Sequence, residues 1–309
     1  MALKGVMRPG HAEVRVLDMD EATNFYGNVL GLIETGRDSV GRVYYRAWDE
    51  RDHNSIILKP ADTAGIDHLA FKVVSPEVLE QLDADLRAYG VPTERVPAGE
   101  LLHTGERVRF EIPSGHLIDL YAEKSKVSTP QTVLNPPPWN PETERGIAPT
   151  RFDHALLYGP DVEKVQKLFV EVLGFYLTEQ VLLEDNQTQL AIFLSCSNKA
   201  HDLALVRHEE PGKLHHISFL LDSWERVLRA ADLMSMSRVP IDIGPTRHGI
   251  TRGSTIYAFD PSGNRFETFC GGYQPYPDWD PLTWSWEEVG AAIFYHDRAL
   301  NERFLSVVT

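Results

Sequence analysis

The chain repeats itself, and this repeat limits its possible folds more than any single residue does. The segment GHAEVRVLDMDEATNFYGNVLGL, which begins at Gly10, shares its pattern with DHALLYGPDVEKVQKLFVEVLGF, which begins at Asp153. In both segments a histidine and an alternating apolar run lead into a helical pattern that ends in Leu-Gly, at an offset of 143 residues. A pattern that recurs at a fixed spacing indicates that one supersecondary unit is used more than once.

A second pair of matching segments indicates that each half of the chain contains two similar units. IDHLAF, which begins at Ile66, matches HHISF, which begins at His215, and the Pro-Ser-Gly turn at Pro113 matches the turn at Pro261. The second histidine of HHISF and the two turns give the same offset of 148 residues. The chain is therefore predicted to contain four similar units of about 55 residues, two in each half.

Each unit is predicted to have the order β-α-β-β-β. Ser75-Pro76 is a good N-cap and first-turn pair, and apolar residues then recur at helical spacing at Val78, Leu79, Leu82 and Leu86. Asp222-Ser223 precedes a similar pattern at Trp224, Val227, Leu228 and Ala231. Strands are predicted at residues 42–45 and 189–193. The expected fold class is α+β, with helices on one side of mostly antiparallel strands.

Length and composition indicate two domains joined by a linker. Residues 1–125 are predicted to form an N-terminal domain of two units, and residues 150–272 a C-terminal catalytic domain of two units. Residues 126–149 form the predicted linker, because the stretch from Lys124 to Pro149 contains six prolines. Such a composition is stiff and lacks regular structure.

The last part of the chain, residues 273–309, is expected to form a tail outside the two domains. It begins with turn residues and continues with an apolar stripe that is typical of a helix from Ser285 to about Leu305. We expect this helix to pack on its own domain or on a neighbouring subunit.

Charge and apolar content exclude several classes of function. The formal net charge of −15 argues against nucleic acid and anionic membranes as partners, because both would be repelled. No apolar run reaches the length needed to span a membrane, and MALKGVMRPG lacks the apolar core of a signal peptide. The only two cysteines, Cys196 and Cys270, fit a reducing compartment with free thiols. We therefore expect a cytoplasmic location.

Three residue types that bind metals stand at matched positions of the second half. His154 and His216 each lie two residues before a core position of a predicted strand, on the same strand face, and Glu267 lies on the last strand of the fourth unit. Any one of them alone would be structural or solvated. Together, two imidazoles and one carboxylate form the ligand set of non-haem Fe(II) oxygenases, which leaves other coordination positions open. His215 points the other way and is expected to be structural or to support the site from behind.

The segment from Thr246 to Glu267, TRHGITRGSTIYAFDPSGNRFE, carries further acid–base groups in His248 and Tyr257. Together with RFDHALLYG, LHHISF and DIGPTRHG, this segment resembles the extradiol ring-cleaving dioxygenases of the vicinal oxygen chelate superfamily, and within them the catechol 2,3-dioxygenase family. The resemblance runs nearly end to end. It is specific because many spacings match at once: Thr246-x-His248, seven residues, Ile256-Tyr257, Asp260-Pro261-x-Gly263 and Glu267.

The resemblance implies that ferrous iron, Fe(2+), is held by His154, His216 and Glu267, although Mn(II) suits the same ligands. It also implies three acid–base residues around the substrate: His201, His248 and Tyr257. His201 would lie on the oxygen side and donate a proton. The implied reaction inserts both atoms of O2 beside the two hydroxyls of catechol or a substituted catechol, giving 2-hydroxymuconic semialdehyde in the degradation of aromatic compounds. A homo-oligomer, commonly a tetramer, is implied as well.

Two rival classes remain open on the same scaffold. A glyoxalase-like metal isomerase would use a metal-bound water or enediolate and often takes its ligands from both halves. A metal-free binding protein would not need two histidines and a glutamate at matched positions. Intradiol cleavage is disfavoured, because that chemistry typically uses Fe(III) with tyrosine ligands.

The first half contains a second plausible ligand set at the equivalent positions, His11, His68 and Asp119. We predict that this set binds no metal. Asp119 is one methylene shorter than Glu267, and Arg109 takes the position of Tyr257. The fixed positive charge of an arginine disfavours a nearby dication.

Overall fold

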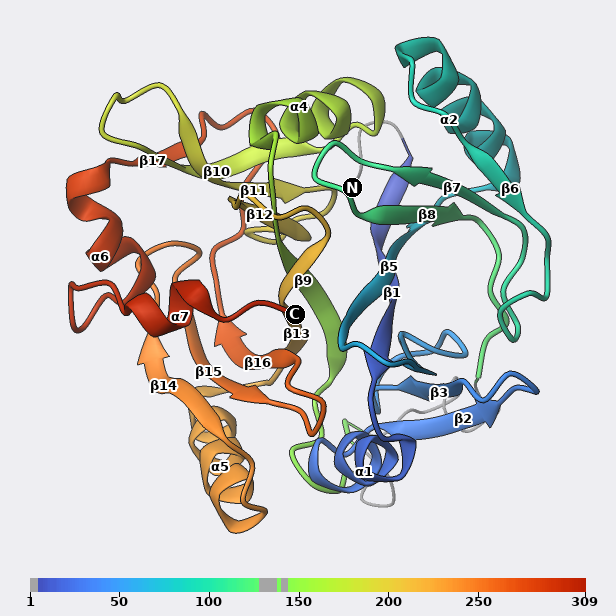
Figure 1. Ribbon diagram of the computed structural model, residues 1–309, viewed down its shortest axis with the longest axis horizontal. Coiled ribbons are helices and arrows are strands. Elements are labelled where there is room, and N and C mark those ends of the chain that lie inside the picture. Colours follow the sequence, from blue (N-terminus) through green and yellow to red (C-terminus); the bar gives the residue numbers. More distant parts are fainter. Residues whose placement is uncertain (1–4, 128–137, 140–143) are drawn as a thin grey trace.

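The computed structural model describes residues 5–127, 138–139 and 144–309. Most of the predicted linker at 126–149 therefore lies outside the described residues. Among the described residues, the two halves of the chain lie side by side, and each half is built around its own mixed sheet (Figure 1).

The first half consists of two units in the predicted order. The first unit contains β1 (Val6–Val16), α1 (Met19–Asn24) with the π-helical turn η1 (Phe25–Val29), β2 (Ile33–Arg37), β3 (Val43–Arg46) and β4 (Ile56–Pro60). The second unit contains β5 (Gly65–Val73), α2 (Pro76–Tyr89), β6 (Glu94–Val96), β7 (Arg107–Glu111) and β8 (Leu117–Tyr121). Their strands form one sheet in the order β2-β3-β4-β1-β5-β8-β7-β6.

The second half repeats this arrangement. Its first unit contains β9 (Arg151–Gly159), α4 (Val162–Lys167) with the π-helical turn η2 (Leu168–Val172), β10 (Tyr176–Leu182), β11 (Gln189–Ser195) and β12 (Leu203–Arg207). Its second unit contains β13 (Lys213–Leu220), α5 (Trp224–Met236), β14 (Ile241–Arg247), β15 (Gly253–Phe259) and β16 (Arg265–Gly271). The sheet order is β14-β15-β16-β13-β9-β12-β11-β10-β17. The predicted α+β class with four βαβββ units is confirmed.

The starts of α2 and α5 follow directly from the local sequence. The Ser75 hydroxyl accepts a hydrogen bond from the Val78 amide, and the Ser223 hydroxyl accepts one from the Arg226 amide, as expected for N-caps. The predicted buried face of α5 is partly wrong, because Trp224 and Leu228 are exposed. The residues of α5 that pack on the sheet are Val227, Ala230 and Met234. The apolar residues of α5 therefore lie on two overlapping faces, and only the face with Val227 is buried against the sheet.

The repeated Pro-Ser-Gly turns join the two halves reciprocally. The turn of the fourth unit contacts the first half: Ser262 Oγ accepts from the Leu17 amide at 2.9 Å, and Asp260 Oδ2 accepts from Tyr26 Oη at 3.0 Å. The turn of the second unit contacts the second half, because the Ser114 carbonyl accepts from the Gly212 amide at 2.9 Å. A continuous apolar core crosses between the halves. This packing holds the central strands β1, β5, β9 and β13 together (Figure 1).

The C-terminal tail differs from its prediction. The expected helix from Ser285 to about Leu305 is interrupted, and the structure instead has the 3-10 turn η3 (Trp286–Glu288), α6 (Val289–Ile293) and α7 (Glu302–Ser306). The tail also adds β17 (Leu282–Trp284) to the second sheet, parallel to β10. The helix breaks after Ile293 because the Ala292 carbonyl accepts the amides of Gly249 and Ile250. No helix among the described residues is long and apolar enough to cross a membrane.

Candidate functional site

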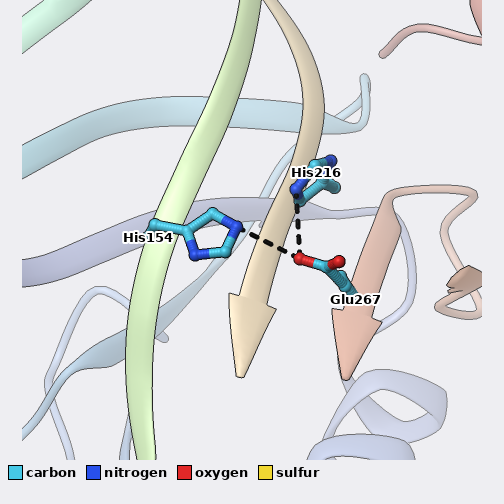
Figure 2. Close-up of side chains that lie close together, drawn as sticks. All are labelled: His154, His216 and Glu267. Atoms are coloured by element: carbon cyan, nitrogen blue, oxygen red, sulfur yellow. Dashed lines mark ion pairs between the residues drawn. The ribbon is translucent and has the colours of Figure 1, made fainter. Parts of the chain in front are cut away.

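The three predicted metal ligands meet on neighbouring strands of the second half (Figure 2). His154 lies on β9, His216 on β13 and Glu267 on β16. β13 pairs with both other strands, so that Ser218 stands opposite His154 on one side and Glu267 on the other. His154 Nε2 lies 3.1 Å and His216 Nε2 lies 3.5 Å from Glu267 Oε2. The expectation that both histidines share one strand face is confirmed.

The protonation states of these groups fit a divalent cation. Burial lowers the pKa of His216 to about 4, so its ring is neutral at pH 7, and its Nε2 is buried without a hydrogen-bond partner among the described residues. Burial would raise the pKa of Glu267, but the neighbouring imidazoles of His154 and His216 hold that pKa well below its usual range. Neutral imidazole and carboxylate are the donors that Fe(II) and Mn(II) accept.

His154 differs from His216 in the direction of its pKa shift. Burial would lower its pKa, but hydrogen bonds to Asp153 and Glu267 outweigh burial and raise the pKa. A histidine in this setting keeps a proton between itself and the carboxylate. A divalent cation held by the same atoms would displace that proton and supply the positive charge instead.

Side chains behind the ligands fix their orientation. His154 Nδ1 donates to Asp153 Oδ2 at 3.0 Å, which leaves Nε2 facing Glu267. Ser218 Oγ and Thr255 Oγ1 donate to the two oxygens of Glu267, each at 2.5 Å. His215 Nδ1 lies 2.6 Å from His216 Nδ1, so His215 supports the ligand from behind, as predicted. Such partners typically hold metal-binding rings in the productive rotamer.

The three predicted acid–base residues surround the same site. One cavity of about 380 Å³ is lined by the ligands, by His201, His248 and Tyr257, and by apolar side chains that include Leu156, Phe193, Ile250 and Phe304. A cavity lined by apolar side chains together with a few convergent polar groups is typical of a site for a small molecule.

His248 and Tyr257 form a hydrogen-bonded pair. His248 Nε2 lies 2.7 Å from Tyr257 Oη, while His248 Nδ1 donates to the Ile293 carbonyl of α6. The proton on Nδ1 leaves the lone pair on Nε2, which accepts from the tyrosine. Burial lowers the pKa of His248, and burial together with the charge of Glu267 raises the pKa of Tyr257 well above its usual value. Both groups are therefore neutral at pH 7. Ile293 was not foreseen from the sequence.

His201 lies against the His154 ring, with ring centroids 3.9 Å apart and planes inclined by 51°. Burial and the neighbouring His154 lower the pKa of His201 well below its usual value. The expected proton donor therefore does not carry the donated proton at the outset. His201 is neutral at pH 7, and it has to receive a proton before it can donate one.

In the first half, basic side chains surround the second set of metal-binding residue types. His11 Nε2 and His68 Nε2 lie 3.0 Å apart, and Lys124 Nζ lies 3.0 Å from His11 Nδ1. Asp119 accepts from Arg107 Nε and Arg109 Nε, each at 2.7 Å. Arg109 faces Asp119 in the register in which Tyr257 faces Glu267. Arg107 and Lys124 escaped the sequence prediction, although Arg107 aligns with Thr255 at the repeat offset.

A related group in the first half, Glu13, Asp67 and His68, also brings metal-binding atoms together. Lys59 Nζ lies 3.4 Å from Glu13 Oε1 and 2.8 Å from Asp67 Oδ1. This group is therefore already partly neutralised by an ammonium.

Because the positive charges of Arg107, Arg109 and Lys59 oppose a dication, we expect about one metal ion per chain. Metal analysis of anaerobically purified protein checks this stoichiometry. His68→Ala should leave the metal content unchanged, whereas His216→Ala should remove most of it. A content close to two per chain, with one ion lost on His68→Ala, would contradict the prediction.

Comparisons with known proteins agree with this geometry. The family described as "Catechol 2,3-dioxygenase-like N-terminal domain" matches residues 66–125. The "Glyoxalase/Bleomycin resistance protein/Dioxygenase superfamily" matches residues 151–268, which include all three candidate ligands. The chain is 54% identical to a metapyrocatechase of Pseudomonas sp. (strain CF600), and the match covers 99% of both chains. The chain belongs to the catechol 2,3-dioxygenase family.

Two further relatives of this chain bear on the choice of metal. The crystal structure of the 2,3-dioxygenase LapB from Pseudomonas sp. KL28 is 64% identical, with a TM-score of 0.90, and the match covers 92% of this chain and 99% of that one. A manganese-dependent 2,3-dihydroxybiphenyl 1,2-dioxygenase of Geobacillus genomosp. 3 is 29% identical over 93% of this chain and 92% of its own length. Family membership therefore leaves the choice between iron and manganese open.

Proposed function

We propose that this protein is an Fe(II)-dependent extradiol dioxygenase that cleaves catechol or a substituted catechol with O2 to a 2-hydroxymuconic semialdehyde, in the degradation of aromatic compounds. One observation carries the proposal: His154, His216 and Glu267 meet at a cavity that is also lined by three neutral acid–base side chains. Neither a metal-free binding protein nor a glyoxalase-like isomerase needs this combination.

A ferrous ion held by His154, His216 and Glu267 would bring the two catechol oxygens and O2 together on one centre. We assign the role of ligand to these residues because they offer two imidazole nitrogens and one carboxylate within 4.8 Å of one another. Mn(II) suits the same donors, and we favour iron because of the resemblance to Fe(II) enzymes.

The His248–Tyr257 pair is positioned to manage a proton of the substrate. With His248 Nδ1 occupied by the Ile293 carbonyl, Nε2 is the atom that can accept a proton. Tyr257 Oη, 2.7 Å from that nitrogen, can accept a proton from a catechol hydroxyl while it passes its own proton to His248 Nε2. General acid–base assistance of this kind contributes about 10²–10⁴-fold.

His201 has a role separate from that of the His248–Tyr257 pair. Its ring is neutral and packs on His154 and on Phe193, so it can accept a substrate proton and return it to an oxygen of the product. Phe193 and the other apolar side chains of the cavity exclude water and flank a planar ring.

Two further properties belong to the proposal. Both cysteines are buried and unpaired, which supports a reducing, cytoplasmic location. A homotetramer is proposed from the family resemblance, and light scattering of the purified protein tests it.

The reaction is tested with a panel of 3- and 4-substituted catechols under ¹⁸O2. The expected result is one O2 consumed per catechol, a yellow ring-opened product and both labelled atoms in that product. Metal-free protein reloaded with Fe(II) or Mn(II) separately identifies the active metal. Absence of O2 uptake with every catechol, together with turnover of a glyoxalase substrate, would overturn the proposal in favour of the isomerase.

A further inference from the structure

The position of His201 is set by the loop that carries it. This loop, residues 196–202, joins β11 to β12, and no other described side chain or backbone group hydrogen-bonds the His201 ring. The ring only packs on His154 and Phe193. Whatever holds the loop backbone in place therefore also sets the distance from His201 to the candidate metal ligand.

Asp202 closes the loop on itself. Its Oδ2 accepts from the Cys196 amide at 2.8 Å, from the Ser197 amide at 3.1 Å and from Ser197 Oγ at 2.8 Å. These bonds use one carboxylate oxygen of a fully buried aspartate. The other oxygen, Oδ1, points to Lys199.

Lys199 links this loop to the strand of the candidate metal ligand. Its Nζ lies 2.9 Å from Asp202 Oδ1 and 3.3 Å from Asp153 Oδ2, and it also donates to the Asp153 carbonyl. Asp153 Oδ2 is the same oxygen that accepts from His154 Nδ1 at 3.0 Å. The Lys199 ammonium thus lies between two carboxylates: that of Asp202, which holds the His201 loop, and that of Asp153, which orients His154.

The charges make this link strong. The side chains of Asp153 and Asp202 are 3% and 0% exposed, and that of Lys199 is 20% exposed. Burial would lower the pKa of Lys199, but the charges of Asp153 and Asp202 raise it. Removing one partner of a buried ion pair leaves an uncompensated charge. Arg151 also contacts Asp153, but it is 49% exposed and a solvated pair compensates little.

We infer that Lys199 is a positioning residue, which couples the orientation of His154 to the placement of His201. The expected effect of Lys199 on turnover rests on the proposed function. Its expected effect on metal retention rests only on the contacts that link Lys199 to His154. Lys199 lies at the wall of the cavity, and its ion pairs and hydrogen bond go to Asp153 and Asp202, through which it acts.

Lys199→Met tests the coupling in two independent measurements. The rate at which a chelator removes the metal should rise, because His154 loses its fixed orientation, and kcat/KM for O2 should fall. Changes of about 10–100-fold are typical for such partners. The same substitution in a His201→Asn background should lower kcat/KM for O2 little further, since residues that act through one another are non-additive. Lys199→Arg should restore part of both effects.

Lys164→Met is the matched control, because Lys164 is 69% exposed and pairs only with Asp161 at the surface. If Lys199→Met does not fold, Lys199→Gln carries the same measurements. Wild-type behaviour in either measurement, or additive effects with His201→Asn, would overturn the inference, as would a lower melting temperature with both rates unchanged. If the wild-type protein cleaves no catechol but Lys199→Met still speeds the removal of the metal by a chelator, the proposed function fails and the link from Lys199 to His154 stands.

Discussion

Glu267→Gln should remove the bound metal and the ring-cleavage activity together. The substitution deletes the only carboxylate charge among the three candidate ligands, and a neutral amide oxygen is a poorer donor for a divalent cation. Loss of one ligand charge should lower kcat by about 10²–10³-fold or more, the typical cost of removing one preorganised electrostatic group from a reaction centre. Metal analysis and O2 uptake on the same anaerobic preparation measure both effects.

The change is well suited to this test, because it keeps the shape of the side chain. Ser218 and Thr255 each donate to one oxygen of Glu267, and the glutamine retains an oxygen for one of them. Glu94→Gln, on the exposed edge strand β6, is the matched control and should change neither property. A Glu267→Gln protein that kept full metal content and full turnover would show that the ligand assignment is wrong.

His201→Asn should leave the metal in place and slow the reaction. No ligand atom of the candidate centre hydrogen-bonds the His201 ring, so the cation loses no donor. The asparagine cannot accept and return a proton as the neutral imidazole can, and a loss of about 10²–10⁴-fold in turnover is expected. Steady-state rates with varied O2, alongside metal content and anaerobic catechol binding, separate this effect from a binding defect.

His296→Asn provides the comparison for His201→Asn, since His296 is an exposed histidine of the tail. It should behave as the wild-type protein does. If His201→Asn instead lost its metal, His201 would belong among the ligands and its assignment as a proton carrier would fail.

The sequence by itself determined the four βαβββ units and the matched positions of the candidate ligands. Strand periodicity places His154 on the same strand face as Leu156, and His216 on the same strand face as Ser218. The repeat then brings Glu267 beside them, because equivalent strands pair in equivalent registers. Helix starts such as Ser75 were equally readable, since an N-cap bond spans only a few residues.

Only the tertiary structure decided which charges and carbonyls surround those positions. Lys124 reaches His11 across 113 residues of sequence, and the Ile293 carbonyl reaches His248 across 45. The break in the C-terminal helix and the link from Lys199 to Asp153 arise in the same way. Such contacts depend on how distant elements pack, and local propensity and periodicity carry no information about distant partners. For this reason the donor atoms of the candidate centre could be read from the sequence, while the groups that orient them could not.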